Sequence, residues 1–349
     1  MQICFYKLQR MWYNKSVKLK KYLRRRIMKA KKLIPTFALL LSLTALTACA
    51  GDKTVEFGNY WTGDALISGT EIHETLKYDA SFAPTEVTET LDYTFAYTNG
   101  SLVTTLDSTT ENGKVVYVFK TEMNIDVTYT FKGESSEPFK DSIVSEVRFY
   151  EAANNLKPIS SNKTIVIHNP TNGNKHTKLS ECYRISNYTI QTTYDEKDKG
   201  NCVVTSTDNA DFSFKDKFSP DKDYNFIDNE QLLVALRAIS KDTSSATVES
   251  YSPFVGNPQK IKFSFADGKS GQKFDLIENG QDFTGDKSRA IAYRKVTMSI
   301  DAANSGSSQI AWVATGNTST YRNVVLRYET PHAYGLGSLV FQLKEITRS

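Results

Sequence analysis

Alternation of apolar and polar residues with a period of two is the feature that most constrains how this chain can fold. In residues 91–98 (LDYTFAYT), large side chains alternate with small or polar ones, so one face of an extended strand would be apolar. Segments 115–119, 126–131 and 142–150 are similarly rich in β-branched and aromatic residues. No crossover helix is visible between these segments, so we expect antiparallel pairing.

Turn residues separate the predicted strands. Asn99-Gly100 suits a two-residue type I′ turn, because both central positions of that turn need a positive φ. We therefore predict a hairpin that joins 91–98 to 101–110, and a second turn at 111–113. Further strands are predicted at 163–168, 183–194, 203–214, 260–265, 273–277, 290–300, 309–314, 323–330 and 338–346.

One amphipathic helix is predicted, near residues 229–239. Asp228 is a natural N-cap, and Gln231 completes a capping-box-like pair. One apolar face, suited to lying on a sheet, would be formed by Leu232, Leu233, Leu236 and Ile239. With about a dozen strands, the sequence predicts an all-β, β-dominated fold over residues 66–349. It would form a large curved antiparallel meander sheet or half-barrel, or else two packed β units divided near 241–250.

The N-terminal residues are typical of a targeting signal. Residues 1–27 are basic and contain no acid; we interpret them as a basic extension ahead of a true start at Met28. Three lysines then precede an uncharged, mostly apolar run, Leu33–Ala48, which is shorter than the roughly 20 residues of a membrane span. This is the pattern of a signal peptide. It closes with Leu46-Thr47-Ala48-Cys49, which resembles the lipobox of bacterial lipoproteins.

The lipobox resemblance implies that the Cys49 thiol is diacylglycerylated and becomes the mature N-terminus. Residues 1–48 would then be removed, and residues 49–65 would form a lipidated tether. The resemblance implies a protein anchored in the bacterial cell membrane and facing outside the cytoplasm. The first 48 residues hold 12 of the 43 basic residues and none of the 39 acidic ones, so the remainder has 31 basic residues and a net charge of −8. This charge argues against nucleic acid as a partner.

Two cysteines remain after the lipobox, Cys182 and Cys202. Outside the cytoplasm such a pair suggests a disulfide. A hairpin that turns at 195–200 would place Cys202 opposite about Thr193, and would separate the sulfurs by about 36 Å along the ladder. The bond then requires that this hairpin be wrong or strongly bent.

Catalytic and metal-binding motifs are incomplete or missing. The loop 221–225 (DKDYN) begins like an EF-hand, but Phe226 and Leu232 stand where Gly and Glu are needed, which leaves a solvated loop or a different calcium site. The triplet 268–270 (GKS) lacks the leading glycine and the helix of a P-loop. His168 and His176 bracket a loop without further metal ligands. We expect no metal and no cofactor.

The predicted curved sheet with a helix across its mouth is similar in pattern to the half-barrels of Lol-type lipoprotein carriers, whose concave face holds acyl chains. This similarity implies a non-enzymatic protein that binds an apolar or lipid-like ligand. Residues that could line its cavity, or equally form plain core, are Tyr93, Phe95, Tyr97, Tyr117 and Phe119. The alternatives are a cell-surface interaction or adhesion module and a hydrolase with dispersed carboxylates.

Overall fold

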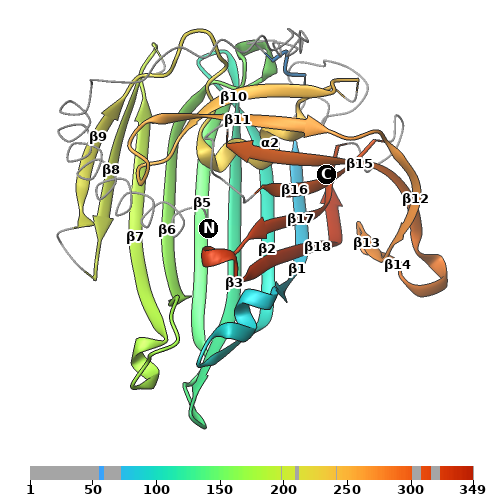
Figure 1. Ribbon diagram of the computed structural model, residues 1–349. Helices are drawn as coiled ribbons and strands as arrows, with labels where there is room; N and C mark the ends of the chain where they lie inside the picture. Colours follow the sequence, from blue (N-terminus) through green and yellow to red (C-terminus); the bar gives the residue numbers. More distant parts are fainter. Residues whose placement is uncertain are drawn as a thin grey trace, which may run out of the picture.

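Figure 1 shows the computed structural model of the chain. It describes residues 55–58, 72–197, 199–208, 212–240, 242–300, 308–315 and 323–348. The predicted signal peptide, Cys49 and most of the predicted tether lie outside the described residues.

The described strands join one nearly closed antiparallel sheet, so the predicted β-dominated fold is confirmed. The first half of the chain supplies β1 (His73–Pro84), β2 (Thr94–Glu111), β3 (Lys114–Phe131), β4 (Glu134–Ser135), β5 (Phe139–Tyr150), β6 (Pro158–Pro170), β7 (Tyr183–Tyr194), β8 (Gly200–Ser206) and β9 (Phe214–Phe218). The second half supplies β10 (Ser245–Tyr251), β11 (Pro258–Phe265), β12 (Lys269–Phe274), β13 (Leu276–Glu278), β14 (Gln281–Phe283), β15 (Arg289–Ile300), β16 (Gln309–Ala314), β17 (Val325–Pro331) and β18 (Gly337–Arg348).

The sheet wraps around because its two halves meet at β1. That strand pairs with β2 on one side and with β18 on the other. From β2 the sheet continues through β3, β5, β6, β7 and β8 to β9. From β18 it continues through β17, β16, β15 and β11 to β10. Strands β12 to β14 project to the right of the barrel in Figure 1.

The edges of the sheet, β9 and β10, meet through side chains. Within the described residues, no backbone ladder joins these two strands. The Phe218 ring stacks on the Tyr251 ring with centroids 3.7 Å apart, and the Tyr251 hydroxyl donates to Asp216 at 2.8 Å. We call this contact the β9–β10 seam. Gly200, opposite Phe218, leaves room for the ring, since a Cβ there would lie 2.0 Å from Phe218 Cζ.

The predicted helix is present, and all of its residues except Leu233 are buried. A 3₁₀ turn, Asn229–Gln231, leads into α2 (Leu232–Arg237), and the capping box between Asp228 and Gln231 is formed. Besides Leu236, the residues Val234, Ala235 and Ala238 are fully buried. The predicted helix is therefore confirmed, but the sheet encloses it, so residues outside the predicted apolar face are buried as well.

The Asn99-Gly100 hairpin was also wrongly predicted. These residues lie inside β2, where the register to β3 shifts between Thr98 and Ser101. Two residues of β2 thus oppose one of β3, which is a β-bulge. The bulge turns Phe95 and Tyr97 to the same face as Leu102 and Leu106. The next Asn-Gly pair, Asn112-Gly113, does form the β2–β3 turn, with φ values of 50° and 75°.

The predicted hairpin between β7 and β8 is confirmed, with Cys202 opposite Thr192, one residue from the expected partner. Cys182 and Cys202 are both free and buried in different core clusters. Burial raises the pKa of each thiol to about 11. None of the helices in the described part of the chain is long and apolar enough to cross a membrane.

Candidate functional site: a cavity inside the barrel

A cavity of about 120 Å³ lies inside the barrel, at the N-terminal end of the helix. Its wall is formed by β2, β3, β5 and β6 on one side and by β16, β17 and β18 on the other. Its apolar lining consists of Leu102, Met123, Ile143, Leu232, Leu233 and Phe341. Its polar lining consists of Thr121, Lys163, Asn229, Glu230, Gln309, Tyr328 and Thr330. A site with both kinds of wall suits an amphiphilic ligand.

An ion pair stands in this wall. Lys163 Nζ on β6 donates to Glu230 Oε1 at 2.7 Å, and both side chains are largely buried. Burial acts to raise the pKa of Glu230, but the adjacent ammonium of Lys163 outweighs it and holds this pKa below its usual value. The carboxylate is therefore ionised, and the cavity contains one charge of each sign.

Asp228, two residues before Glu230, has a different role. Its carboxylate accepts from the Glu230 N–H at 2.8 Å, from the Ser161 hydroxyl at 2.6 Å and from the Tyr194 hydroxyl. Burial, together with the nearby Glu230 charge, raises the pKa of Asp228. These bonds tie the start of the helix to β6 and β7. The carboxylate is occupied in holding the helix.

Arginines fix the other end of the helix. Arg237 donates to both Glu74 oxygens, at 2.6 and 3.0 Å, and Arg348 on β18 donates to the same carboxylate. Burial acts to raise the pKa of Glu74, but the two guanidinium groups bring it below its usual value. Arg294 donates to the carbonyls of Ile239 and Ser240 at 3.0 and 2.9 Å, where the helix dipole favours a cation. The helix is held at both ends, so this wall of the cavity is preformed.

The residues predicted to line a cavity lie in two separate clusters. Tyr93, Phe95 and Tyr97 pack in a cluster with Tyr129, around the start of β2 and the end of β3. Tyr117 and Phe119 pack in the core cluster that contains the helix. Of the five, Phe119 reaches a cavity, a space of about 10 Å³ bordered by Leu233 and Arg237.

Sequence reasoning missed Lys163 and Glu230. One signal for Lys163 was available: it shares a face of β6 with Ile165 and Ile167, so a charge stands in line with buried isoleucines. Glu230 had no such signal, since a glutamate in the first turn of a helix is usually explained by the helix dipole.

The histidines considered as metal ligands pair with acids distant in sequence. His168 Nδ1 lies 2.7 Å from Asp141 Oδ1, and His176 Nδ1 lies 2.5 Å from Asp92 Oδ1. In the predicted calcium-like loop, Asp221 Oδ1 accepts from the Asp223 N–H at 3.1 Å. The described residues contain no group of three or more His, Cys, Asp or Glu placed to hold a metal ion.

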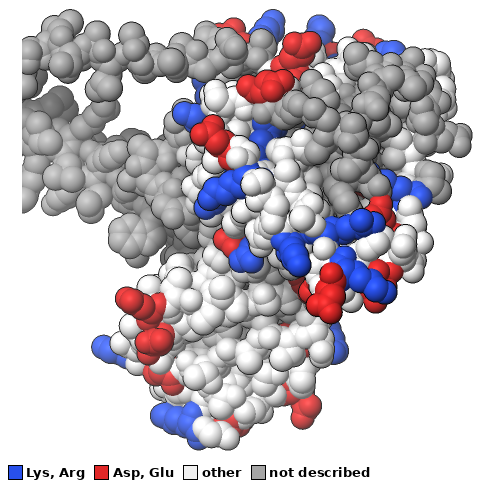
Figure 2. Space-filling model, turned by 90° about the vertical axis from the view of Figure 1, so that its right-hand side faces the viewer, with Lys and Arg blue, Asp and Glu red and all other residues white. Residues whose placement is uncertain are grey.

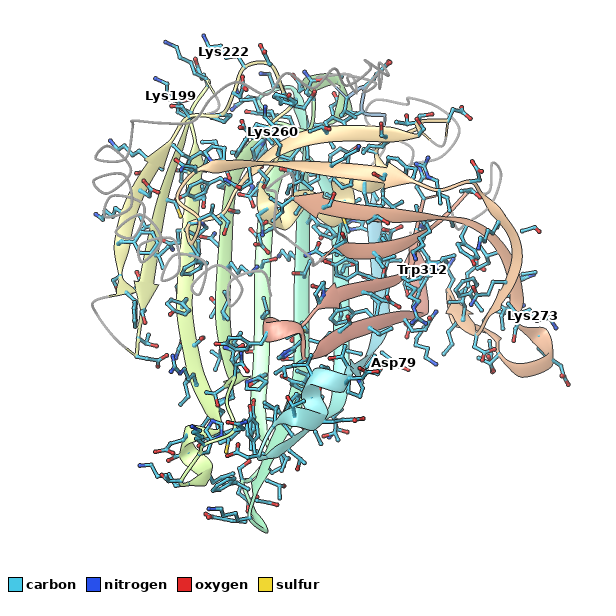
Figure 3. The ribbon with its side chains drawn as sticks, in the orientation of Figure 1. Asp79, Lys199, Lys222, Lys260, Lys273 and Trp312 are labelled. Atoms are coloured by element: carbon cyan, nitrogen blue, oxygen red, sulfur yellow. The ribbon has the colours of Figure 1, made fainter. Side chains whose placement is uncertain are left out.

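The outer surface of the C-terminal strands carries mixed charges. On the face shown in Figure 2, lysines and arginines are interspersed with acids. Cross-strand pairs join Lys77 to Glu345 at 2.9 Å and Lys344 to Asp79 at 3.3 Å. Trp312, labelled on this side in Figure 3, lies between Lys295 and Arg327. Such a surface favours solubility over binding of a polyanion.

Comparison with protein-family models and with curated proteins finds no match. Among solved structures, the chain is similar to a beta-barrel-like protein of the domain of unknown function DUF1849 from Brucella abortus. The identity is 8%, the TM-score is 0.42, and the alignment covers 80% of this chain and 98% of that one. A likeness at this level identifies no function for this chain.

Proposed function

We propose that this protein is a lipid-anchored, extracytoplasmic β-barrel protein that binds an apolar or lipid-like ligand in its interior and catalyses no reaction. The observation that carries the proposal is the internal cavity with a preformed wall, apolar on one part and polar on another. Its volume of about 120 Å³ is below the roughly 300–1,000 Å³ of pockets for drug-sized ligands. A lipid would therefore enter with local opening of the barrel, and in the described part of the chain no backbone ladder joins β9 to β10.

The hydrogen bonds of Asp228 support a binding protein rather than a hydrolase. A carboxylate pair with separated pKa values is a mark of acid–base catalysis, and Asp228 and Glu230 form such a pair. Yet Asp228 accepts three hydrogen bonds that cap the helix, and Glu230 pairs with Lys163. Both carboxylates already have structural partners.

A lipid on Cys49 would bring the upper end of the barrel close to the membrane. The Val55 N–H donates to Asn225 Oδ1 at 2.8 Å, and Phe57 bridges to Ile239. The few residues from Cys49 to Val55 span about 22 Å at most when fully extended. Strand β3, with 18 residues, is about 60 Å long. The end with Lys199 and Lys222, at the top of Figure 3, would then face the bilayer.

Native mass spectrometry of the purified chain, followed by extraction of whatever is bound, tests the ligand. We expect a bound mass of lipid size. A clean apo mass, with no uptake when lipids are offered, would contradict the proposal and favour an interaction module.

The anchor is tested separately. Cys49→Ser is expected to release the chain from membranes or leave it unprocessed; unchanged partition with an unchanged mature N-terminus would exclude lipidation. In vesicles with an amine-reactive headgroup, the lipidated chain should be labelled at Lys222 and not at Lys132, in the turn between β3 and β4. Equal labelling of the two lysines would contradict the orientation.

A further inference from the structure

The buried ion pair between Lys163 and Glu230 contributes too little to the stability of the fold to explain its presence in the cavity. Lys163 and Glu230 are 8% and 14% exposed, and their charged atoms lie 2.7 Å apart. A buried ion pair contributes little net stability, because the cost of removing both charges from water offsets their attraction. Both side chains also line the cavity, so an occupant would contact them directly.

Each member of the pair keeps hydrogen-bonding capacity. An ammonium has three N–H donors, and Glu230 Oε1 is the single acceptor that the described residues offer to Lys163 Nζ. Glu230 Oε1 also accepts from Asn229 Nδ2 at 3.1 Å, whereas in the described part of the chain nothing donates to Oε2. The pair thus presents donors and an acceptor to the same space.

The two charges select a ligand that carries both signs. An anion would be attracted by Lys163 and repelled by Glu230, and a cation would meet the reverse, so neither gains much. A group with an acidic oxygen and an ammonium can satisfy both side chains at once, and charge complementarity of this kind produces specificity. The cavity lining also includes the apolar side chains of Leu102, Met123 and Phe341.

We propose that the ligand is an amphiphile with a zwitterionic head, whose acidic oxygen binds Lys163 and whose ammonium binds Glu230, as in phosphoethanolamine or an α-amino acid. This inference rests on the proposed function, ligand binding in the barrel interior. A water needs about 10–15 Å³ of such space, so the cavity of about 120 Å³ has the size of a small head group. The apolar part of the ligand would displace side chains along the apolar wall.

The test compares two short-chain lipids with identical tails, dihexanoyl-phosphatidylethanolamine and dihexanoyl-phosphatidylglycerol. Their binding to the full chain is measured by titration calorimetry. A hydrogen bond to a charged group corresponds to about ten- to a hundredfold in affinity, and we expect the zwitterionic lipid to bind more tightly by this factor. Lys163→Met/Glu230→Gln should remove the preference, so that the two lipids bind with similar affinity.

A control removes an ion pair from the outer face of β3 and β5, two other strands of the cavity wall. Lys120 on β3 pairs with Glu146 on β5 at 3.2 Å, and Lys120→Met/Glu146→Gln should retain the preference for the zwitterionic lipid. Because the lipid comparison is made on the unmodified chain, it stands even if the interior variant fails to fold.

The outcomes separate the two proposals. Equal affinity for the two lipids overturns the zwitterionic head but leaves ligand binding intact. Binding of neither lipid overturns the proposed function. Free phosphoethanolamine that binds as tightly as its lipid would support the zwitterion site and overturn the lipid-like ligand.

Discussion

The barrel closes at two places, and they are built differently. Between β1 and β18, backbone pairing runs from Glu74 opposite Arg348 to Pro84 opposite Gly337, and the Glu74 carboxylate binds arginines of the helix and of β18. At the β9–β10 seam, the described residues meet through side chains, among them the Phe218–Tyr251 stack and the hydrogen bond from the Tyr251 hydroxyl to Asp216. On the edge of β10 that faces away from β11, backbone pairing comes instead from the segment before the helix. There, the Ile227 N–H donates to the Glu249 carbonyl at 3.0 Å.

The difference indicates which part of the wall can open. Separating β1 from β18 would break a long ladder and expose a buried carboxylate with its arginines. Separating β9 from β10 would expose aromatic rings but break few hydrogen bonds, and regions with few such bonds open at low free energy. We therefore expect opening to start at the β9–β10 seam.

The largest effect is expected at the β1–β18 closure. Glu74→Gln removes the negative charge between Arg237 and Arg348, and breaking a buried pair in this way costs about 3–5 kcal/mol. Urea denaturation measures this loss. The control is Glu345→Gln, which breaks the exposed pair with Lys77 and should cost about 1 kcal/mol or less. Similar losses in the two variants would mean that the buried triad does not hold the closure.

Lowering the pH tests the contribution of Glu74 to the β1–β18 closure without a substitution. Because the pKa of Glu74 is lowered in the folded state, its carboxylate contributes stability that is present above the unfolded pKa, near 4.5. This contribution is lost as the pH falls through the lower, folded pKa. We expect the free energy of unfolding to fall as the pH drops below about 5, and to fall less in Glu74→Gln. Identical pH profiles would exclude a role for this carboxylate.

A smaller effect is expected at the β9–β10 seam. In Gly200→Ala, the new Cβ would lie within 2.0–2.6 Å of the Phe218 ring and force it away from Tyr251. Overpacking of this kind costs about 1–3 kcal/mol. Amide hydrogen exchange should become faster in β9 and β10 and stay unchanged in β1 and β18. The control is Gly268→Ala, where the nearest contact would be Tyr293 O at 4.0 Å; equal effects would argue against the seam.

The smallest effect is expected from the hydroxyl at the seam. Tyr251→Phe keeps the ring stack and removes the hydrogen bond to Asp216, at a cost of about 1 kcal/mol in unfolding free energy. The hydrogen-exchange change should be smaller than that of Gly200→Ala. A larger change would show that the hydroxyl, and not the ring, closes the seam.

Local signals in the sequence predicted the strands and the helix cap. Alternation placed β7 at Tyr183–Tyr194, and Asp228 with Gln231 marked the start of the helix. The two Asn-Gly pairs show that a local signal alone does not decide the structure. Asn112-Gly113 forms a turn, whereas Gly100 lies against β1, with Ala80 O only 2.5 Å from the place of a Cβ. A neighbouring strand, brought in by the tertiary fold, made the difference between a turn and a bulge.

The cavity, like the bulge at Gly100, could not be predicted from local sequence signals. The sequence by itself determined the β-rich class, the Asn112-Gly113 turn and the helix that begins after Asp228, because these depend on residues a few positions apart. Only the tertiary structure decided that the helix lies inside the barrel and that Lys163 meets Glu230, 67 residues away. It also brought Glu74 to Arg348, 274 residues away. Such contacts depend on how the whole sheet closes, and no pattern of neighbouring residues encodes the register of that closure.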